Sequence, residues 1–130
     1  MTHAPNGPQT RKAQVGAVNH HNGVAAEHAV ARHYADQGYP LVAERWRGDA
    51  GELDLVFAKG TGLIVVEVKS APSHDQAALR FGASQMQRVC QTAQQFVGQY
   101  PAGLDTEMRI DLALVDQFGV VATLENVTLH

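Results

Sequence analysis

The amino-acid sequence predicts a single α/β domain, spanning 21–130, in which a mixed central sheet is flanked by helices. Two strand-like runs joined by a short glycine-containing turn form the centre of the pattern, at 52–58 and 63–69. One helical stretch precedes these runs, and a second follows them before further strand-like runs. The chain has 130 residues, 45% of them apolar and 18% charged, which is typical of one soluble globular domain.

Composition excludes several classes of protein. The net charge of −3 argues against a protein that coats nucleic acid through charge alone. It does not exclude a nuclease, because catalytic carboxylates add negative charge until a metal binds them. The longest apolar run, 63–66, is too short to span a bilayer, which takes about 20 residues. A single cysteine, Cys90, permits neither an internal disulfide nor a cysteine-based zinc cluster. Because the sequence starts without the apolar stretch of a signal peptide, we expect a cytoplasmic protein and no membrane partner.

The first expected elements are a tail and a helix. Residues 1–20 contain closely spaced Pro and Gly and no apolar period, which predicts a flexible tail. A helix is predicted over 22–37, with Asn22 as the N-cap and Gly38 at the C′ position. Glu27 falls on the apolar side of this helix. A lone carboxylate there is costly unless it is paired, or unless it reaches water or an arginine from the edge of the apolar stripe.

Past this helix, the sequence alternates between strands, turns and one more helix. Regular alternation of apolar residues predicts the strands, and an apolar stripe that includes Cys90 predicts the helix and places this cysteine in the core. Lys59-Gly60-Thr61-Gly62 predicts a hairpin turn. The expected segments are a short segment at 41–46, strands at 52–58, 63–69, 108–115 and 120–127, a loop at 70–83 and a helix at 84–97.

The hairpin brings charged side chains together. If the turn is symmetric about Gly60-Thr61, Ala58 faces Leu63, Asp54 faces Glu67 and Glu52 faces Lys69. The four charged residues then share one face of the strands, and the other face carries the apolar residues Leu53, Leu55, Ile64, Val66 and Val68. Opposed residues have Cβ atoms about 4.5–5.5 Å apart, so the pair of Asp54 and Glu67 destabilises the sheet if nothing balances its charge.

A hard divalent cation resolves this conflict. Mg²⁺ binds one or two protein carboxylates together with waters and phosphate oxygens, which suits Asp54 and Glu67. Lys69, on the same face, can then orient or deprotonate a water, or neutralise charge that develops on phosphorus. The alternative is a solvated sheet face on which Glu52 simply pairs with Lys69.

These residues carry a family resemblance. An Asp followed by Glu-x-Lys resembles the core motif of restriction-endonuclease-like proteins, and more narrowly the chain resembles the YraN-like family of small bacterial predicted nucleases. The resemblance covers about 22–115. It includes, in order, Gly23-Val24-Ala25-Ala26-Glu27, Arg45 or Arg47, Gly51-Glu52-Leu53-Asp54, Glu67-Val68-Lys69, Phe81-Gly82, an Arg-containing helix and Arg109-Ile110-Asp111.

The resemblance implies a restriction-endonuclease-like fold and a site. By it, Asp54 and Glu67 are ligands of Mg²⁺ or Mn²⁺, Lys69 is the catalytic lysine, and Glu27 is a further catalytic carboxylate. Two departures remove positive charge that could hold phosphate. Gln85 stands where family members usually carry Lys, and Ser70-Ala71 replaces Thr-Arg.

Other polar residues leave alternatives open. Arg88 and Gln85 share a side of the second helix, where they either contact substrate phosphate or form a solvated face. Glu52 is a supporting residue. Asp111 either supports the site from a neighbouring strand or pairs with Arg109. The histidines show no spacing of a complete zinc-ligand set.

Two functions follow from these patterns. The first is an endonuclease that depends on Mg²⁺ or Mn²⁺ and hydrolyses DNA, branched or structured DNA included, because the fold also resembles that of Holliday-junction resolvases. The second is a module of the same fold that binds nucleic acid or a protein without cleaving. Nucleic acid, DNA in particular, is the expected partner. The oligomeric state stays open, with a homodimer as one alternative.

Overall fold

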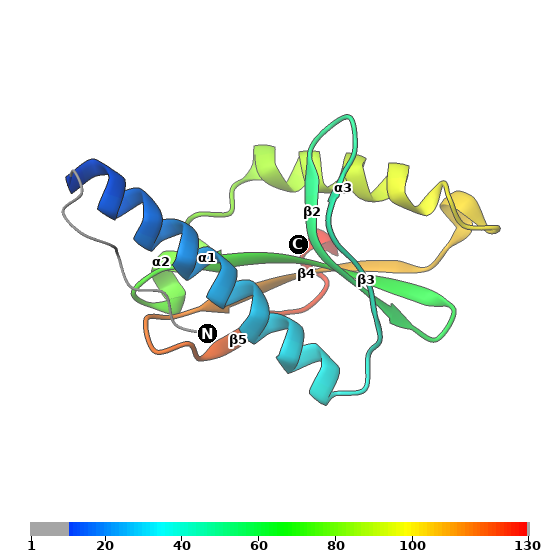
Figure 1. Ribbon diagram of the computed structural model, residues 1–130. Coiled ribbons are helices and arrows are strands. Elements are labelled where there is room, and N and C mark those ends of the chain that lie inside the picture. The colour runs from blue at the N-terminus through cyan, green and yellow to red at the C-terminus, as the bar shows by residue number, and fades with distance from the viewer. Residues whose placement is uncertain (1–10, 130) are drawn as a thin grey trace.

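A five-stranded sheet with helices on both faces forms the protein (Figure 1). The computed structural model describes residues 11–129, with side chains described from Gly23 to Thr128. The strands are β1 (Leu41–Arg47), β2 (Glu52–Lys59), β3 (Gly62–Ser70), β4 (Met108–Val115) and β5 (Val121–Leu124). The helices are α1 (Arg11–Asp36), α2 (His74–Ala78), α3 (Ala83–Val97) and the 3₁₀ turns η1 (Gly103–Asp105) and η2 (Val127–Leu129).

The sheet is mixed, as predicted. The strands lie in the order β1-β2-β3-β4-β5; β3 and β4 are parallel, and the other neighbours are antiparallel. A parallel pair needs a long connection, and here the chain between β3 and β4 forms α2 and α3. No helix among the described residues is both long and apolar enough to cross a membrane.

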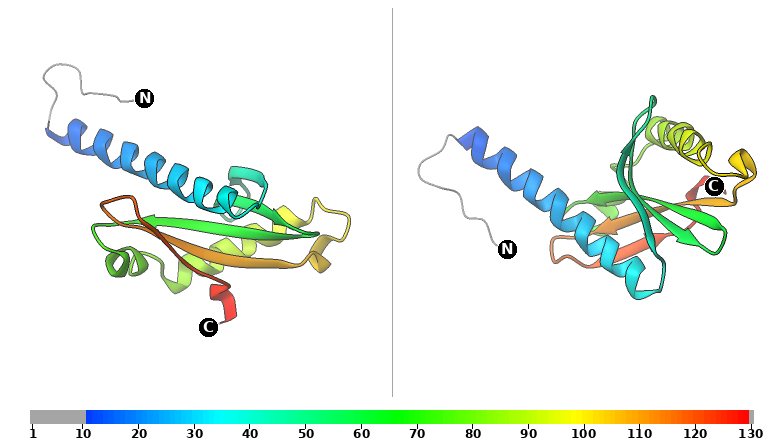
Figure 2. Two further views of the ribbon diagram at one scale, coloured as in Figure 1. Left: turned by 90° about the horizontal axis from the view of Figure 1, so that it is seen from below. Right: turned by 45° about the vertical axis from the view of Figure 1, so that its right-hand side comes forward.

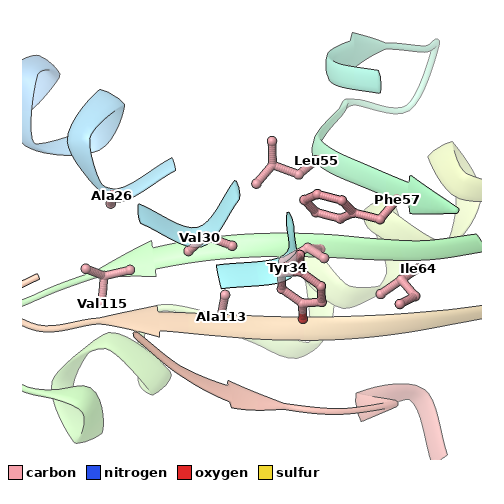
Figure 3. Packing of buried hydrophobic residues seen from close by; sticks show 9 residues of the cluster. Ala26, Val30, Tyr34, Leu55, Phe57, Ile64, Ala113 and Val115 are labelled. Carbon is pink, nitrogen blue, oxygen red and sulfur yellow. The ribbon is translucent and has the colours of Figure 1, made fainter. Parts of the chain in front are cut away.

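Apolar side chains fill both faces of the sheet. The α1-side cluster packs α1 against the centre of the sheet (Figure 3) and consists of Ala26, Val30, Tyr34, Leu55, Phe57, Ile64, Val66, Ala113 and Val115. The α3-side cluster consists of Leu53, Val56, Leu63, Val65, Val89, Ala93, Phe96, Val97 and Ile110, and Cys90 packs against it as expected of a core cysteine. Figure 2 shows the sheet between the two helices. Because both faces are covered, the central strands are almost continuously apolar.

The C-terminal end of α1 confirms the prediction for Gly38, but the helix begins earlier than predicted. Gly38 has φ +89°, and the amide of Tyr39 donates to the carbonyl of Tyr34, as expected of a Schellman cap. The helix starts at Arg11, so residues 11–20 are helical rather than a tail, and Asn22 lies inside the helix. No proline interrupts this stretch, and lengthening a helix that has already formed avoids the free-energy cost of starting a new one. Residues 1–10 of the predicted tail lie outside the described residues.

Three other segments differ from the predictions. The expected loop at 70–83 contains α2, a helix of five residues that is too short to show a period, with Ser73 as its N-cap. The segment after Tyr39-Pro40 forms a full strand, β1. Strand β5 ends at Leu124, before the predicted boundary, because the chain turns at Asn126, whose φ is +55°.

The first residue of β3, Gly62, lies very close to the backbone of Glu107, the residue before β4. A Cβ on Gly62 would lie 2.7 Å from the carbonyl oxygen of Glu107, whereas a Cβ on Gly23 would meet nothing within 4 Å. Gly62→Ala should therefore lower the free energy of unfolding by about 1–3 kcal/mol. Gly23→Ala, the matched control in α1, should raise it by about 0.5–1 kcal/mol. Denaturant titration measures both values, and equal stability of the two variants would contradict the close approach.

Candidate functional site

The sheet divides between β2 and β3. Their register follows the prediction from Lys59–Gly62 through Ala58–Leu63 to Leu55–Val66, and the pairing ends there. In a continued ladder Val68 would face Leu53. Instead, the amide of Val68 donates to Oδ2 of Asp54 at 2.9 Å. The amide of Asp54 contacts Oε2 of Glu67 at 3.4 Å, so the two carboxylates occupy the place of the ladder.

Each strand continues with its other neighbour beyond this point. Strand β2 stays paired with β1 as far as Arg47–Glu52, and β3 stays paired with β4 as far as Ser70–Val115. The result is an opening between two strand pairs. The predicted opposition of Glu52 and Lys69 is therefore wrong, because the ladder does not reach these residues.

The side chains of β2 do not keep one alternation through the division. Leu55 belongs to the α1-side cluster and Leu53 to the α3-side cluster, although two residues apart on a regular strand should share a face. The prediction that Leu53 and Leu55 share a face is thus wrong. On the neighbouring strand, Arg45 has φ +50°, a left-handed conformation that breaks the regular alternation of β1.

A cavity of about 340 Å³ lies at this opening between β2 and β3. Segments that are far apart in the sequence form its wall: α1, the β2–β3 hairpin and α3. The lining includes every candidate residue of the sequence except Asp111, namely Glu27, Glu52, Asp54, Glu67, Lys69, Gln85 and Arg88. The structure therefore gathers residues that lie up to 61 positions apart, from 27 to 88, around one space.

Asp54 and Glu67 form the acidic centre of this cavity. The Glu67 side chain is 3% exposed, and that of Asp54 is partly buried. Within the described part of the chain, no Lys, Arg or His nitrogen lies within 4.0 Å of either carboxylate. Burial raises the pKa of Asp54, and burial together with the Asp54 charge raises the pKa of Glu67 to about 8. A proton is therefore retained at neutral pH unless a cation replaces it.

The donor set of this pair fits a hard divalent cation. Mg²⁺ and Mn²⁺ prefer oxygen ligands, and Mg²⁺ commonly takes only one or two carboxylates from the protein. Asp54 and Glu67 supply this number. No group of three or more His, Cys, Asp and Glu side chains gathers as a metal site among the described residues, which does not favour zinc.

Glu27 both lines the cavity and forms an ion pair. Its Oε1 accepts from Nε of Arg45 at 3.0 Å, and Nη2 of Arg45 is also 3.0 Å away. The pairing raises the pKa of Arg45. The left-handed residue of β1 thus holds the carboxylate that α1 presents to the cavity. Glu52, at the opposite wall, pairs with Arg47 at 3.3 Å rather than with Lys69.

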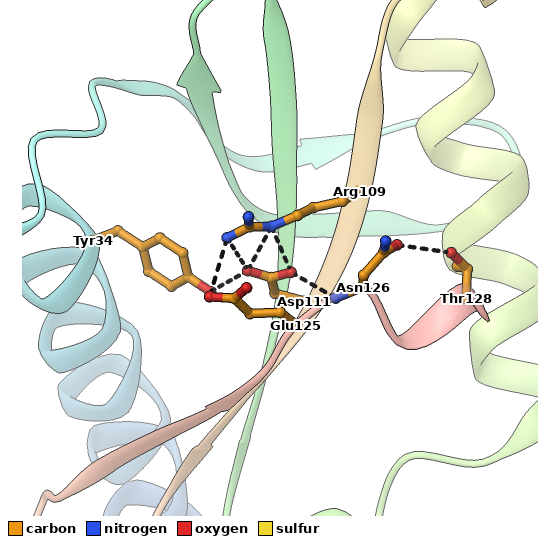
Figure 4. A network of polar contacts seen from close by, with 6 residues as sticks. All are labelled: Tyr34, Arg109, Asp111, Glu125, Asn126 and Thr128. Atoms are coloured by element: carbon orange, nitrogen blue, oxygen red, sulfur yellow. Dashed lines mark hydrogen bonds and ion pairs between the residues drawn. The ribbon is translucent and has the colours of Figure 1, made fainter. Parts of the chain in front are cut away.

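Asp111 lies outside the cavity, in a buried network on β4 (Figure 4). Its carboxylate is fully buried and pairs with Arg109 at 3.0 Å, which is the second of the two alternatives that the sequence left open. Oδ2 accepts from the Tyr34 hydroxyl at 2.7 Å, and Oδ1 accepts from the Asn126 amide at 3.0 Å. Burial and the hydrogen bond to Asp111 raise the pKa of Tyr34. Asp111 therefore ties α1 and the end of the chain to the sheet.

Sequence reasoning missed a contact that fixes the turn before Glu52. Oε1 of Gln95 accepts from the Asp49 amide at 2.8 Å, and its Nε2 donates to Oδ2 of Asp49 at 3.3 Å. A Cβ on Gly48 would collide with Oε1 of Gln95, so glycine makes room for this contact. Thr92, one turn earlier on α3, is buried in the cavity wall. The only signal in the sequence is a glutamine-rich helix face, which does not single out Gln95.

The raised pKa of Glu67 predicts a pH dependence of stability. With chelator present, the folded protein holds a proton that the unfolded chain loses above its ordinary carboxyl pKa of 4.5. The free energy of unfolding should therefore fall as the pH rises from about 5 to 9. Glu67→Gln should weaken this slope and melt several degrees above the unsubstituted protein at pH 9. Thermal melts across this range measure it, with Glu44→Gln as the exposed control; parallel curves for the original and Glu67→Gln proteins would contradict the prediction.

Comparison with known proteins identifies relatives along nearly the whole chain. The model of the Uncharacterised protein family UPF0102 matches residues 26–115. A UPF0102 protein of Roseobacter denitrificans is 46% identical over 120 residues, covering 92% of this chain and 93% of the relative. One of Cereibacter sphaeroides is 45% identical, covering 85% of this chain and 95% of the relative, and one of Ruegeria pomeroyi is 43% identical, covering 91% and 96%. The chain therefore belongs to UPF0102, the YraN family that its motifs resemble.

Proposed function

We propose that this chain is a Mg²⁺- or Mn²⁺-dependent endonuclease of restriction-endonuclease-like fold that hydrolyses DNA in the cytoplasm. One observation carries the proposal: Asp54, Glu67 and Lys69 line a single cavity at the point where β2 and β3 separate. The mixed sheet between α1 and α3 and the ordered motifs of the sequence support it.

Asp54 and Glu67 are the residues that would hold the cation. Each side chain is buried enough for its pKa to rise, and neither has a basic partner within 4.0 Å among the described residues. A bound cation would supply positive charge for the scissile phosphate and would favour deprotonation of water. Backbone amides hold one oxygen of each carboxylate, since Val68 donates to Oδ2 of Asp54 and the Asp54 amide donates to Oε2 of Glu67.

Lys69 acts on the reacting groups and does not serve as a ligand. In phosphodiester hydrolysis, a water oxygen forms a bond to phosphorus, one P–O ester bond breaks, and the leaving oxygen gains a proton. Lys69, two residues after Glu67 on β3, is placed to orient the water or to balance charge that develops on phosphorus. Both roles require an ammonium group beside the acidic pair.

The helices supply the remaining polar groups. Glu27, held by Arg45, offers a further carboxylate on the cavity wall for orienting water. Arg88 and Gln85 of α3 line the opposite wall, where a guanidinium and an amide can contact a substrate phosphate. In this proposal, DNA enters between the two helices and meets the acidic centre at the divided sheet.

A non-cleaving binding module is the second candidate. It is favoured by the loss of positive charge at two positions, where Gln85 and Ala71 replace the Lys and Arg that the family resemblance implies. With fewer cations, phosphate is held less firmly, and a retained acidic pair could bind a cation without productive cleavage. The two candidates differ in what they predict for Lys69.

Cation binding is the first test. Isothermal calorimetry at neutral pH should show Mn²⁺ binding to the unsubstituted protein and a loss of at least about tenfold in affinity in Asp54→Asn, because a ligand oxygen is replaced by an amide. Glu44→Gln, which changes an exposed carboxylate on β1, is the matched control. Equal affinity in the original and Asp54→Asn proteins would remove the basis for a metal site.

Cleavage is the second test. In Mn²⁺, Lys69→Met should reduce cleavage of linear, nicked or branched DNA by about 10²–10³-fold while Mn²⁺ affinity stays nearly unchanged. Both proteins must be purified identically, so that a contaminating nuclease would appear equally in both. Unchanged cleavage in Lys69→Met would contradict the mechanism, and equal inactivity of both proteins on every substrate would favour the binding module.

A further inference from the structure

A second cavity of about 610 Å³ adjoins the first. The two share Ala26 of α1 and Ser70 at the end of β3 as lining residues, so they lie side by side. Its lining includes the ends of β3 and β4, Arg80 after α2 and the β4–β5 turn. Figures 1 and 2 show that these segments lie at the same end of the sheet. A ligand held at the acidic centre can therefore extend past Ser70 toward this end of the sheet.

Arg80 supplies positive charge to the second cavity. Its Nη1 donates to the carbonyl oxygen of Ser70 at 2.9 Å, which holds the guanidinium at the boundary between the cavities. No carboxylate of the described residues lies within 4.0 Å of Arg80. The remaining guanidinium donors are thus available for a phosphate.

Asp116 also lines this cavity, but its carboxylate is used by the turn. Oδ1 accepts from the amides of Phe118 at 2.9 Å and Val120 at 3.0 Å. Oδ2 lies 3.8 Å from Nε2 of His74. These contacts offset part of the negative charge and fix the conformation of the turn.

Phe118 projects from this turn with 80% of its surface exposed. Its neighbours in the sequence, Gln117 and Gly119, both line the second cavity. The ring is not itself among the residues that line the cavity; it lies in water on the turn between two of them. A nucleobase offers a flat surface that matches the ring, and stacking of this kind contributes about 1–3 kcal/mol per base.

We propose that the second cavity binds a single strand of DNA that continues from the acidic centre, with Arg80 on a phosphate and Phe118 stacked on a base. This inference rests on the proposed function and adds the substrate class, DNA with a single-stranded segment. Stacking on Phe118 requires an unpaired base, which a regular duplex does not present. The protein's net charge of −3 and the single cation among the described lining residues also favour one strand over the two backbones of a duplex.

Binding of DNA without divalent cations tests this proposal separately from cleavage. Fluorescence anisotropy at low fixed salt measures the affinity of the full chain for a labelled 20-nucleotide oligothymidine and for a blunt duplex. The original protein should prefer the single strand. Arg80→Ala and Phe118→Ala should each weaken its binding by at least about fivefold. Phe118→Trp and Arg80→Lys should retain most of the affinity.

The matched controls are Leu104→Ala, another exposed apolar residue, and Arg32→Ala, an exposed cation of α1. Both should bind the oligonucleotide like the original protein. Phe118→Trp adds a direct readout, because stacking should quench its fluorescence beyond the change seen for Trp46 alone. Thermal melts of all variants exclude loss of the fold.

The outcomes separate this inference from the proposed nuclease. Weaker binding in Arg80→Ala and Phe118→Ala supports the second cavity even if no DNA is cleaved in Mn²⁺. Affinity equal to that of the controls, or no preference for the single strand, overturns it even if Lys69-dependent cleavage is observed.

Discussion

The bond from the Val68 amide to the Asp54 carboxylate is the contact on which the site depends. It takes the place of a backbone bond between β3 and β2, so the two strands separate after Leu55–Val66. The separation creates the cavity, and one oxygen of each carboxylate accepts from an amide of the opposite strand. In a continuous ladder the two carboxylates would instead have faced each other from paired strands.

Two buried acidic centres on neighbouring strands illustrate opposite solutions to one electrostatic problem. Asp111 on β4 is fully buried, and its charge is balanced by Arg109, the Tyr34 hydroxyl and the Asn126 amide. Glu67 on β3 is nearly as buried but has no basic partner within 4.0 Å among the described residues, and its pKa rises. The first arrangement stabilises the fold, whereas the second leaves a demand for positive charge that a ligand can meet.

The parts of the structure that local patterns control could be predicted. The hairpin register follows from a symmetric turn and strand alternation, and the end of α1 follows from Gly38. Glu27 could be singled out because helical spacing placed it on the packed side of α1. These signals lie within a few turns or one strand pair.

The parts that depend on distant residues could not be predicted. Gln95 reaches Asp49 across 46 positions, and Tyr34 reaches Asp111 across 77, so no period in the sequence marks either pair. The division of the sheet was missed because strand alternation assumes a ladder that continues, whereas the Val68 amide donates to the side chain of Asp54. The five residues of α2 are too few to establish a helical period.

Because the sheet divides, β1 and the first residues of β2 form a two-stranded arm that is not paired with β3. Five residue pairs join β2 to β3, all of them in the part of β2 that follows the arm. Beyond them, Arg45–Glu27 connects the arm to α1 and Asp49–Gln95 connects it to α3. Leu53 and Trp46 also pack into the α3-side cluster, so apolar packing fixes the arm on this side of the opening. On the other side the arm depends on the ion pair of Arg45 and Glu27, a contact between partly exposed charges that salt weakens.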